Sequence, residues 1–363
     1  MHRSVAFVRS MGVIRLRMMG GRGVGLPRAV RVPGLGARLA AAWLSVAVLC
    51  PLVPLASGAQ AVDDVRVEDD NGQLDFWLPP RRRPDTELTN AALAHLVIDG
   101  TAGWGWLMHR PACALASATA SCATTDLEFG QEMYTPAGAT QSPTPRVGAR
   151  PYAGWLYLAG TARVATTSRS DAITIEAGVT GSPSFAAQVQ TAWHDLIGYP
   201  RALGWSHQIP FQPGVLIAVQ RDAEVAHLSI HGVPVLSIIP QAGMSVGNVL
   251  TGAHVGAEMH LGYGVSTPWS SSVHGRGRPI ELYALAGARE DLIAYQMFLD
   301  QGTTNPVMHV AKEPTVFQYD FGIGARFGAF ELEYRGITRG REYLTGPPLH
   351  PYGTLAVGIR STW

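Results

Sequence analysis

The stretch GTLAVGIRSTW, residues 353–363, decides the fold class of this chain. As an extended strand it places on one face Leu355, Val357, Ile359, Ser361 and Trp363. Arg360 and Thr362 face the other way. A C-terminal strand with an apolar outer face and an aromatic last residue is typical of β-barrels of the Gram-negative outer membrane.

Alternation of apolar and polar residues recurs through most of the chain. It is clear in WLYLAGTARVAT (155–166), DAITIEAGV (171–179) and FELEYRG (330–336), and Gly, Pro, Asp and Ser separate such segments. A soluble β-sandwich would show the same alternation, so the C-terminal strand and the N-terminal segment are the features that favour a transmembrane barrel. About 300 residues allow about ten to fourteen strands with their connections. Residues 79–90 and 136–150 are predicted loops.

The first 61 residues differ in composition from the remainder. They contain several arginines and no Asp or Glu, then an apolar run, LAAAWLSVAVLCPLVPLA (39–56), and an A-x-A cleavage signal at Ala59 and Ala61. These features predict a signal peptide with an upstream extension over 1–61 and an outer-membrane β-barrel domain over 62–363. Beyond residue 61 no apolar run approaches the ~18 residues that a spanning helix needs. The net charge of +1, with 15% charged residues, indicates no nucleic-acid surface.

Two cysteines, Cys113 and Cys122, remain after the predicted cleavage and lie in a segment rich in Ala, Ser and Thr. In an oxidising compartment they predict a disulfide that closes a short loop, rather than a metal or catalytic site.

A short helix is predicted around TAWHDLIG, residues 191–198. From Ser184 onward the apolar residues recur at helical spacing, with Ser182 or Ser184 as the N-cap and Gly198 as the stop. His194 lies beside this apolar stripe. A histidine on such a helix is, taken alone, more often structural than catalytic, so its role depends on the rest of the chain.

Two further motifs have ordinary explanations as well as functional ones. GMSVG (243–247) matches the G-x-S-x-G motif of serine hydrolases, but that motif needs a strand, a sharp turn and a helix, and the residues after it are strand-like. Ser245 is therefore a weak nucleophile candidate, and a soluble periplasmic hydrolase is the least favoured class. The acidic run VEDDNG (67–72) fits a solvated surface, and its hard carboxylate oxygens also suit Ca²⁺.

Several stretches, in chain order, resemble the outer-membrane lipid A deacylases, the LpxR-type lipid A 3′-O-deacylase family. They are EDD (68–70), LTNA (88–91), GQEMYTP (130–136), RPYAGWLYL (150–158), QVQTAWHDLIG (188–198), GW (204–205), GNVLTGAHVG (247–256) and FLDQG (298–302). The resemblance implies a barrel of about twelve antiparallel strands in the outer membrane. It also implies Ca²⁺-dependent hydrolysis of the ester that links the 3′ acyl chain to lipid A.

The resemblance assigns roles to residues by position. It places the base that activates water at His194, on a loop helix packed by the barrel wall, and Ca²⁺ at Asp69 and Asp70. Further catalytic positions fall on Thr89, Asn90 and Arg150. The chemistry suits ester hydrolysis, because a histidine is a base near neutral pH and a carboxylate-held metal supplies positive charge where the oxyanion forms.

Ala91 replaces the Gly of the family's T-N-G turn, and two further departures bear on the chemistry. Asp69 stands where the family has Asn, so removal of its charge is expected to be tolerated, whereas loss of Asp70 is not. The carboxylate that the family carries about two turns after the histidine is absent, because Pro200 and Arg201 occupy that region. The group that orients His194 is therefore not identified from the sequence.

The alternative function is that of a non-catalytic outer-membrane barrel, either an inactive homologue or a narrow channel. The expected partners are lipid A or lipopolysaccharide as substrate and the outer membrane, without nucleic acid. The expected oligomeric state is a monomer.

Overall fold

The computed structural model describes residues 62–76, 78, 87–100, 122–270, 279–300 and 310–360. The predicted signal peptide (1–61), Cys113 and the last three residues of the C-terminal strand lie outside the described residues. The disulfide between Cys113 and Cys122 stays a prediction for the same reason.

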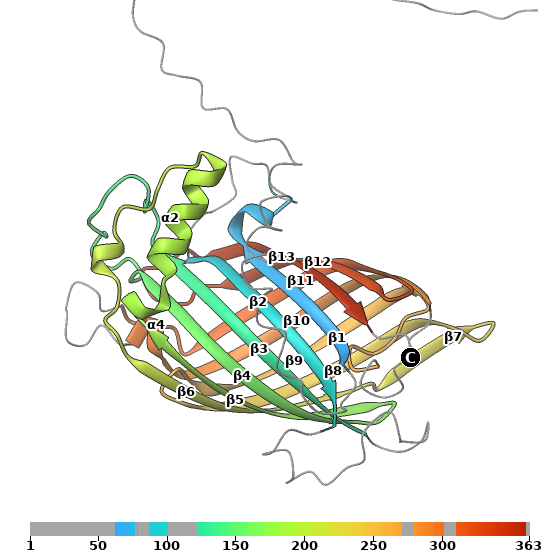
Figure 1. Cartoon of the computed structure of the whole chain (residues 1–363). Helices are drawn as coiled ribbons and strands as arrows, with labels where there is room; N and C mark the ends of the chain where they lie inside the picture. The colour runs from blue at the N-terminus through green and yellow to red at the C-terminus, as the bar shows by residue number, and fades with distance from the viewer. Residues whose placement is uncertain are drawn as a thin grey trace, which may run out of the picture.

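Thirteen antiparallel strands form one sheet in the described part of the chain, and twelve of them close into a barrel (Figure 1). The strands are β1 (Val62–Asn71), β2 (Glu87–Asp99), β3 (Cys122–Thr135), β4 (Ala153–Ala165), β5 (Arg169–Thr180), β6 (Pro213–Ala223), β7 (Ala226–Ile230), β8 (Val233–Gly247), β9 (Leu250–Tyr263), β10 (Ile280–Gln296), β11 (Thr315–Phe327), β12 (Phe330–Gly340) and β13 (Leu349–Arg360). Pairing of β1 with β13 and of β6 with β8 closes the ring, and the short β7 only extends a hairpin with β8. The predicted all-β barrel of about twelve strands is confirmed.

Strand alternation gives this barrel an apolar outside. In β13, Ile359 is exposed, whereas Thr354 and Ala356 on the opposite face are buried. Ile359 lies opposite Val65 of β1, so the C-terminal strand seals the ring with its apolar face outward. Large exposed apolar side chains cover other strands in the same way, among them Leu158, Ile175, Ile217, Leu261 and Ile323. Such an outer surface is what a lipid-facing barrel wall requires.

The helices gather at one end of the barrel (Figure 1). They are η2 (Gly72–Leu74), η6 (Ser182–Ser184), α2 (Ala186–Ile197), η7 (Trp205–His207) and α4 (Met297–Asp300). At the opposite end the turns 166–168 and 328–329 are short, and the connection 264–279 is half as long as the connection 181–212 at the helical end. Because outer-membrane barrels have short periplasmic turns and longer extracellular loops, we assign the helical end to the cell exterior. Among the described residues, no helix is long and apolar enough to cross a membrane.

The local predictions had mixed outcomes. Residues 136–150 form the predicted loop, but residues 87–90 are the first part of β2, because they pair with the end of β3. Gly198, with a φ of 69°, ends α2 as predicted. Neither predicted serine is the N-cap: Phe185 holds that position, and the Ser184 hydroxyl instead donates to the Gly181 carbonyl at 2.6 Å.

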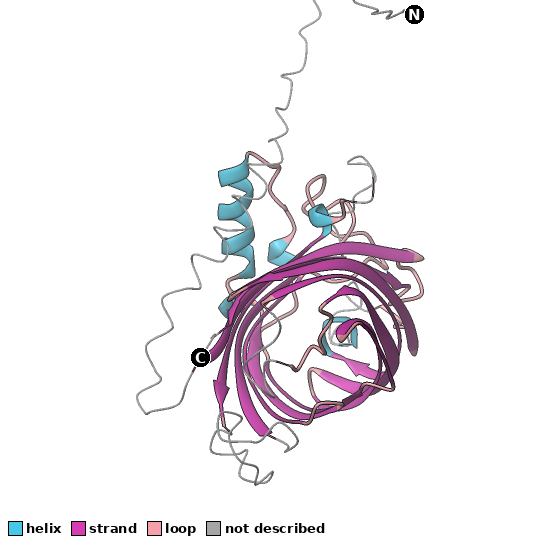
Figure 2. Ribbon diagram, turned by 90° about the vertical axis from the view of Figure 1, so that its right-hand side faces the viewer, coloured by secondary structure: helices cyan, strands magenta, loops and turns pink. Residues whose placement is uncertain are grey.

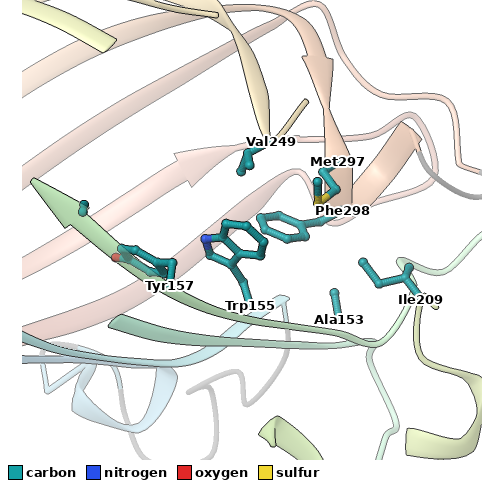
Figure 3. Close-up of a cluster of buried hydrophobic side chains, with 8 residues drawn as sticks. Ala153, Trp155, Tyr157, Ile209, Val249, Met297 and Phe298 are labelled. Carbon is teal, nitrogen blue, oxygen red and sulfur yellow. The ribbon is translucent and has the colours of Figure 1, made fainter. Parts of the chain in front are cut away.

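A hydrophobic cluster, here called the mouth plug, lies inside the barrel at its extracellular end. Its members are Ala153, Trp155, Tyr157, Ala159, Ile209, Val249, Met297 and Phe298. Trp155 comes from β4 and Phe298 from α4, which follows β10 on the far side of the ring, and their ring centroids are 6.2 Å apart (Figure 3). Phe298 also stacks on Tyr134 of β3 with centroids 4.9 Å apart. The plug therefore joins opposite walls of the barrel across its lumen.

Candidate active site on the outer wall of the barrel

The outward face of β1–β3 carries polar side chains near its extracellular end. Asp69 lies opposite Leu355, which is on the same face of the sheet as the exposed Ile359. Asn90 and Gln131 continue this outward face on β2 and β3. A lipid-facing wall is normally apolar, so polar groups at this place need a specific reason.

Two of these polar side chains are joined by a hydrogen bond, and the third bonds to the loop that holds α2. The Asn90 side-chain amide donates to Asp69 Oδ1 at 2.6 Å, and the Gln131 amide donates to the Ser184 carbonyl at 2.6 Å. Asp69 is only 5% exposed and Gln131 is 7% exposed. The loop between β5 and β6, which holds α2, therefore shields part of the outer wall from lipid.

Helix α2 packs against the outside of β3 and β4, as predicted for a loop helix held by the barrel wall. Gly154 of β4 makes this possible, because a Cβ atom at that position would collide with Ser184 and Ala186. Ala186 and Met133 belong to one buried cluster, which joins the start of the helix to β3. Figure 2, seen along the barrel, shows the helix outside the ring of strands.

The buried face of α2 is polar after its first turn. Ala186, Gln190 and His194 recur at intervals of four residues, and all three are buried. The Trp205 indole donates to Gln190 Oε1 at 2.7 Å, which fixes the helix against η7. His194, 5% exposed, is thus on the helix face that packs toward the barrel and not on the exposed face.

A backbone carbonyl orients His194. Its Nδ1 lies 2.7 Å from the Pro200 carbonyl oxygen, and a carbonyl can only accept, so Nδ1 carries the proton. Nε2 is then the unprotonated nitrogen of the neutral ring, the form that a general base needs. The Tyr199 ring meets the imidazole edge-to-face at 5.0 Å between centroids. Pro200, which replaces the expected carboxylate in sequence, thus supplies the orienting acceptor through its backbone.

An ion pair closes the turn that carries Pro200. Arg201 donates to both carboxylate oxygens of Asp195 at 2.5 Å, across the end of α2. This hydrogen-bonded guanidinium holds the pKa of the Asp195 carboxyl below its ordinary value. The pair is exposed, so its contribution is to the geometry of the turn more than to stability.

The two adjacent aspartates point to opposite sides of the barrel wall. Asp70 accepts a hydrogen bond from the inward-facing Thr354 at 2.5 Å, so its carboxylate lies on the lumen side. Asp69 is on the outer side with Asn90. This separation follows from strand geometry, because successive side chains in a strand alternate between faces. The structure brings Asp69, and not Asp70, to the face on which α2 packs.

Thr89 and Arg150 lie at the extracellular end of β2. Thr89 is at an irregularity in the pairing of β2 with β3, and its hydroxyl is 2.6 Å from that of Thr135. Arg150 is fully buried and donates to Glu87 at 3.1 Å and to Glu342 at 3.3 Å. Its guanidinium also lies over the Tyr134 ring, 4.4 Å from the centroid.

The pKa of Glu342, which lies in the loop after β12, reflects the charge balance of this cluster. Burial by itself would raise the pKa of Glu342, but the guanidinium groups of Arg339 and Arg150 hold it below its ordinary value. Arg150 is therefore engaged in a buried ion-pair network at the barrel mouth, on the side of the wall that carries Tyr134 and the mouth plug.

The oxygen donors of the outer wall suit a hard cation. They are the carboxylate of Asp69 and the side-chain amide oxygens of Asn90 and Gln131. Within the described ranges there is no group of three or more His, Cys, Asp or Glu residues placed to hold a metal. Ca²⁺ accepts carboxylate, amide, backbone and water oxygens, so these residue types are chemically compatible with Ca²⁺.

The serine motif does not form a nucleophile elbow. GMSVG lies within β8, where Ser245 pairs with Gly252 of β9 and Ala218 of β6. The next element is strand β9, so residues 233–263 lack the strand–turn–helix geometry that exposes such a serine.

Sequence reasoning missed three groups that shape the site. They are the Gln131 amide, the Gln190 amide and the Pro200 carbonyl. Gln131 could have been noticed, because it interrupts an outward apolar series that contains Leu127 and Phe129 in β3. A backbone carbonyl leaves no signal in a sequence.

Together, fold and site define a class of protein: an outer-membrane β-barrel with a buried histidine on a loop helix that packs on its outer wall. The sequence profile described as outer membrane protein LpxR matches residues 43–361. The chain belongs to this LpxR family and is a protein of the outer membrane. No curated protein matches the chain.

One solved structure supports the fold, and a second is similar only at a low level. LpxR from Salmonella typhimurium superposes with a TM-score of 0.67 at 16% identity, covering 82% of this chain and 100% of that chain. The β-domain of the Bordetella autotransporter BrkA gives a TM-score of 0.43 at 10% identity, covering 83% of this chain and 99% of that one.

Proposed function

We propose that this protein is a Ca²⁺-dependent lipid A 3′-O-deacylase in which His194 activates water. The observation that carries the proposal is His194 itself, buried on α2 with Nδ1 bound to the Pro200 carbonyl and Nε2 left as the acceptor. Membership of the LpxR family supports the substrate class. One chain supplies every group of the proposed site, which supports action as a monomer.

The proposed reaction is hydrolysis of the ester that holds an acyl chain at the 3′ position. His194 Nε2 takes a proton from water as the water oxygen attacks the ester carbonyl carbon, and a tetrahedral oxyanion forms. The carbon–oxygen bond to the sugar then breaks, and the imidazolium returns its proton to the departing sugar oxygen. The Pro200 carbonyl stabilises the imidazolium through Nδ1 during both steps.

We propose Asp69 as the carboxylate that would hold Ca²⁺, with the amide oxygens of Asn90 and Gln131 as neutral ligands. When bound, Ca²⁺ supplies positive charge at the oxyanion. Asp70 lies across the wall from this place, and we propose that it stabilises the lumen side through Thr354.

We assign Thr89 and Arg150 a supporting part in the same proposal. Their contacts hold the extracellular end of β2, and with it Asn90, against β3 and the loop after β12. They would act on the site through backbone position rather than by contact with the reacting atoms.

The Pro200 carbonyl also bears on the alternative of an inactive homologue. The main reason for that alternative is the absence of a carboxylate after His194. A backbone acceptor at 2.7 Å performs the same orienting task, so the departure in sequence need not mean loss of activity.

Mass spectrometry of lipid A tests the proposal in cells that express the parent chain, His194→Ala or His207→Ala. His207 is on η7 of the same loop and is the matched control. We expect loss of one acyloxyacyl chain with the parent and with His207→Ala, and none with His194→Ala. Intact lipid A with the folded parent, or deacylation by His194→Ala, would refute the proposal.

A further inference from the structure

Helix α2 presents three different faces. Its buried face carries Gln190 and His194, whose partners Trp205 and Pro200 belong to the same loop. A second face is exposed and apolar, formed by Phe185 at the N-cap and, at helical intervals, Val189, Ala192 and Leu196. Gln188 and Asp195, seven residues apart, form a third edge that is exposed and polar.

The exposed apolar face is large for a surface helix. Phe185 is 56% exposed and Leu196 is 60% exposed, although a helix facing water places polar residues there. In the same loop Leu203 and Phe211 are also exposed. Asp195 is the one charged carboxylate of α2, and Arg201 neutralises it. An apolar face with so little charge fits hydrocarbon better than water.

This face continues a surface that already meets lipid. Helix α2 packs on the outside of β3 and β4, and the next outward residues of this wall include Leu158, 63% exposed on β4. Val215 of β6, close in sequence to Phe211, is exposed as well. Figure 2 shows the helix outside the ring of strands. The outside of the ring is the side of a transmembrane barrel that faces lipid.

We infer that α2 is an interfacial helix whose Phe185–Val189–Leu196 face inserts among the acyl chains of the outer leaflet. The polar edge with Gln188 and the Asp195–Arg201 pair lies toward water. The helix thus sets the depth of the barrel and holds the His194 side of the wall at the level of the lipid chains. This inference concerns lipid contact alone and stands whether or not the protein hydrolyses lipid A.

Spin-label accessibility in phosphatidylcholine nanodiscs tests the inference. Single cysteines replace Val189, Leu196, Gln188 or Leu158 in the full-length protein after Cys50, Cys113 and Cys122 have been changed to Ser. For each nitroxide we compare the increase in relaxation rate caused by oxygen with that caused by a water-soluble nickel chelate. Oxygen concentrates in hydrocarbon, whereas the chelate stays in water. Leu158→Cys is the lipid-facing reference, and a heat-dependent gel shift verifies that each barrel is folded.

We expect labels at 189 and 196 to respond to oxygen like the label at 158, and the label at 188 to respond to the nickel chelate. Labels at 189 and 196 that respond like the label at 188 would overturn the inference. Shielding of these labels from both reagents, with spin–spin broadening that grows with the number of chains per disc, would overturn it in favour of a second copy.

Discussion

At the scale of single residues, one step along β1 moves a carboxylate from one side of the barrel wall to the other. Asp69 bonds to Asn90 on the outer side, and Asp70 bonds to Thr354 on the inner side. The sequence shows only a run of three acids, and the relative importance of Asp69 and Asp70 depends on which of them lies on the face where α2 packs. That is a property of register, which is settled by pairing with β2 and β13.

The sequence predicts that the protein tolerates loss of charge at Asp69 but not loss of Asp70. From the structure we expect the opposite effects on activity. Asp69→Asn should lower deacylation by about 100-fold, because it removes the one carboxylate of the proposed Ca²⁺ site. It should also raise the Ca²⁺ concentration needed for half-maximal activity. Asp70→Asn should stay close to the parent, because Thr354 can still donate to the new side chain.

Purified protein in detergent–lipid A micelles, stripped with chelator and titrated with Ca²⁺, provides the measurement. Mg²⁺ added back instead serves as the metal control. Asp70→Asn activity that falls as far as that of Asp69→Asn would return Asp70 to the metal site. Full activity in excess chelator would remove the metal from the mechanism.

At the scale of elements, the strands were predictable and the orientation of the helix was not. Alternation in β4, β5, β12 and β13 shows in the sequence because each strand has one face in lipid. For α2 the sequence predicts helical spacing and an end at Gly198, but the ordinary assumption turns the apolar stripe toward the protein. Here the buried face carries polar Gln190 and His194, because Trp205 and the Pro200 carbonyl of the following loop supply their hydrogen-bond partners.

Contacts distant in sequence account for the remaining features that could not be predicted. Arg150 pairs with Glu87 and with Glu342, which lie 63 and 192 positions away along the chain. Only closure of the ring brings these residues to one mouth. For this reason an arginine that could have bound substrate is found in a buried ion-pair network.

Close packing of α2 on the barrel wall depends on the absence of a side chain at Gly154. Gly154→Ala should move the helix off the wall, because the new methyl group would meet Ser184 and Ala186. We expect at least a tenfold loss of deacylation, since displacement of a positioned base by even ~1 Å is costly. The barrel should keep its heat-dependent gel shift, because the strand ladder is untouched.

Gly358→Ala in β13 is the matched control, because a Cβ atom there has its nearest neighbour at 3.5 Å. It should keep both fold and activity. Parent-like activity of Gly154→Ala would mean that His194 reaches its position without close docking of α2.

At the scale of the whole molecule, strand pairing closes the barrel wall and the mouth plug crosses the lumen. Pairing of β1 with β13 and of β6 with β8 closes the wall, so the twelve described strands of the ring leave no edge open to lipid. The mouth plug joins β4 to α4 across the lumen. With the candidate site on the outer wall, the lumen has no part in the proposed reaction, and the plug bears instead on the alternative of a narrow channel.

The plug is therefore expected to block ion flow. The parent protein should show no discrete conductance in a planar bilayer, because Trp155 is 1% exposed and Met297 and Phe298 fill the space opposite it. Trp155→Ala combined with Phe298→Ala should open a path and give measurable current. Each large-to-small change costs about 3–5 kcal/mol of packing, so the gel shift should confirm that the double variant is folded. Steady conductance by the parent, equal to that of the double variant, would show that the plug does not seal the lumen and would favour the channel.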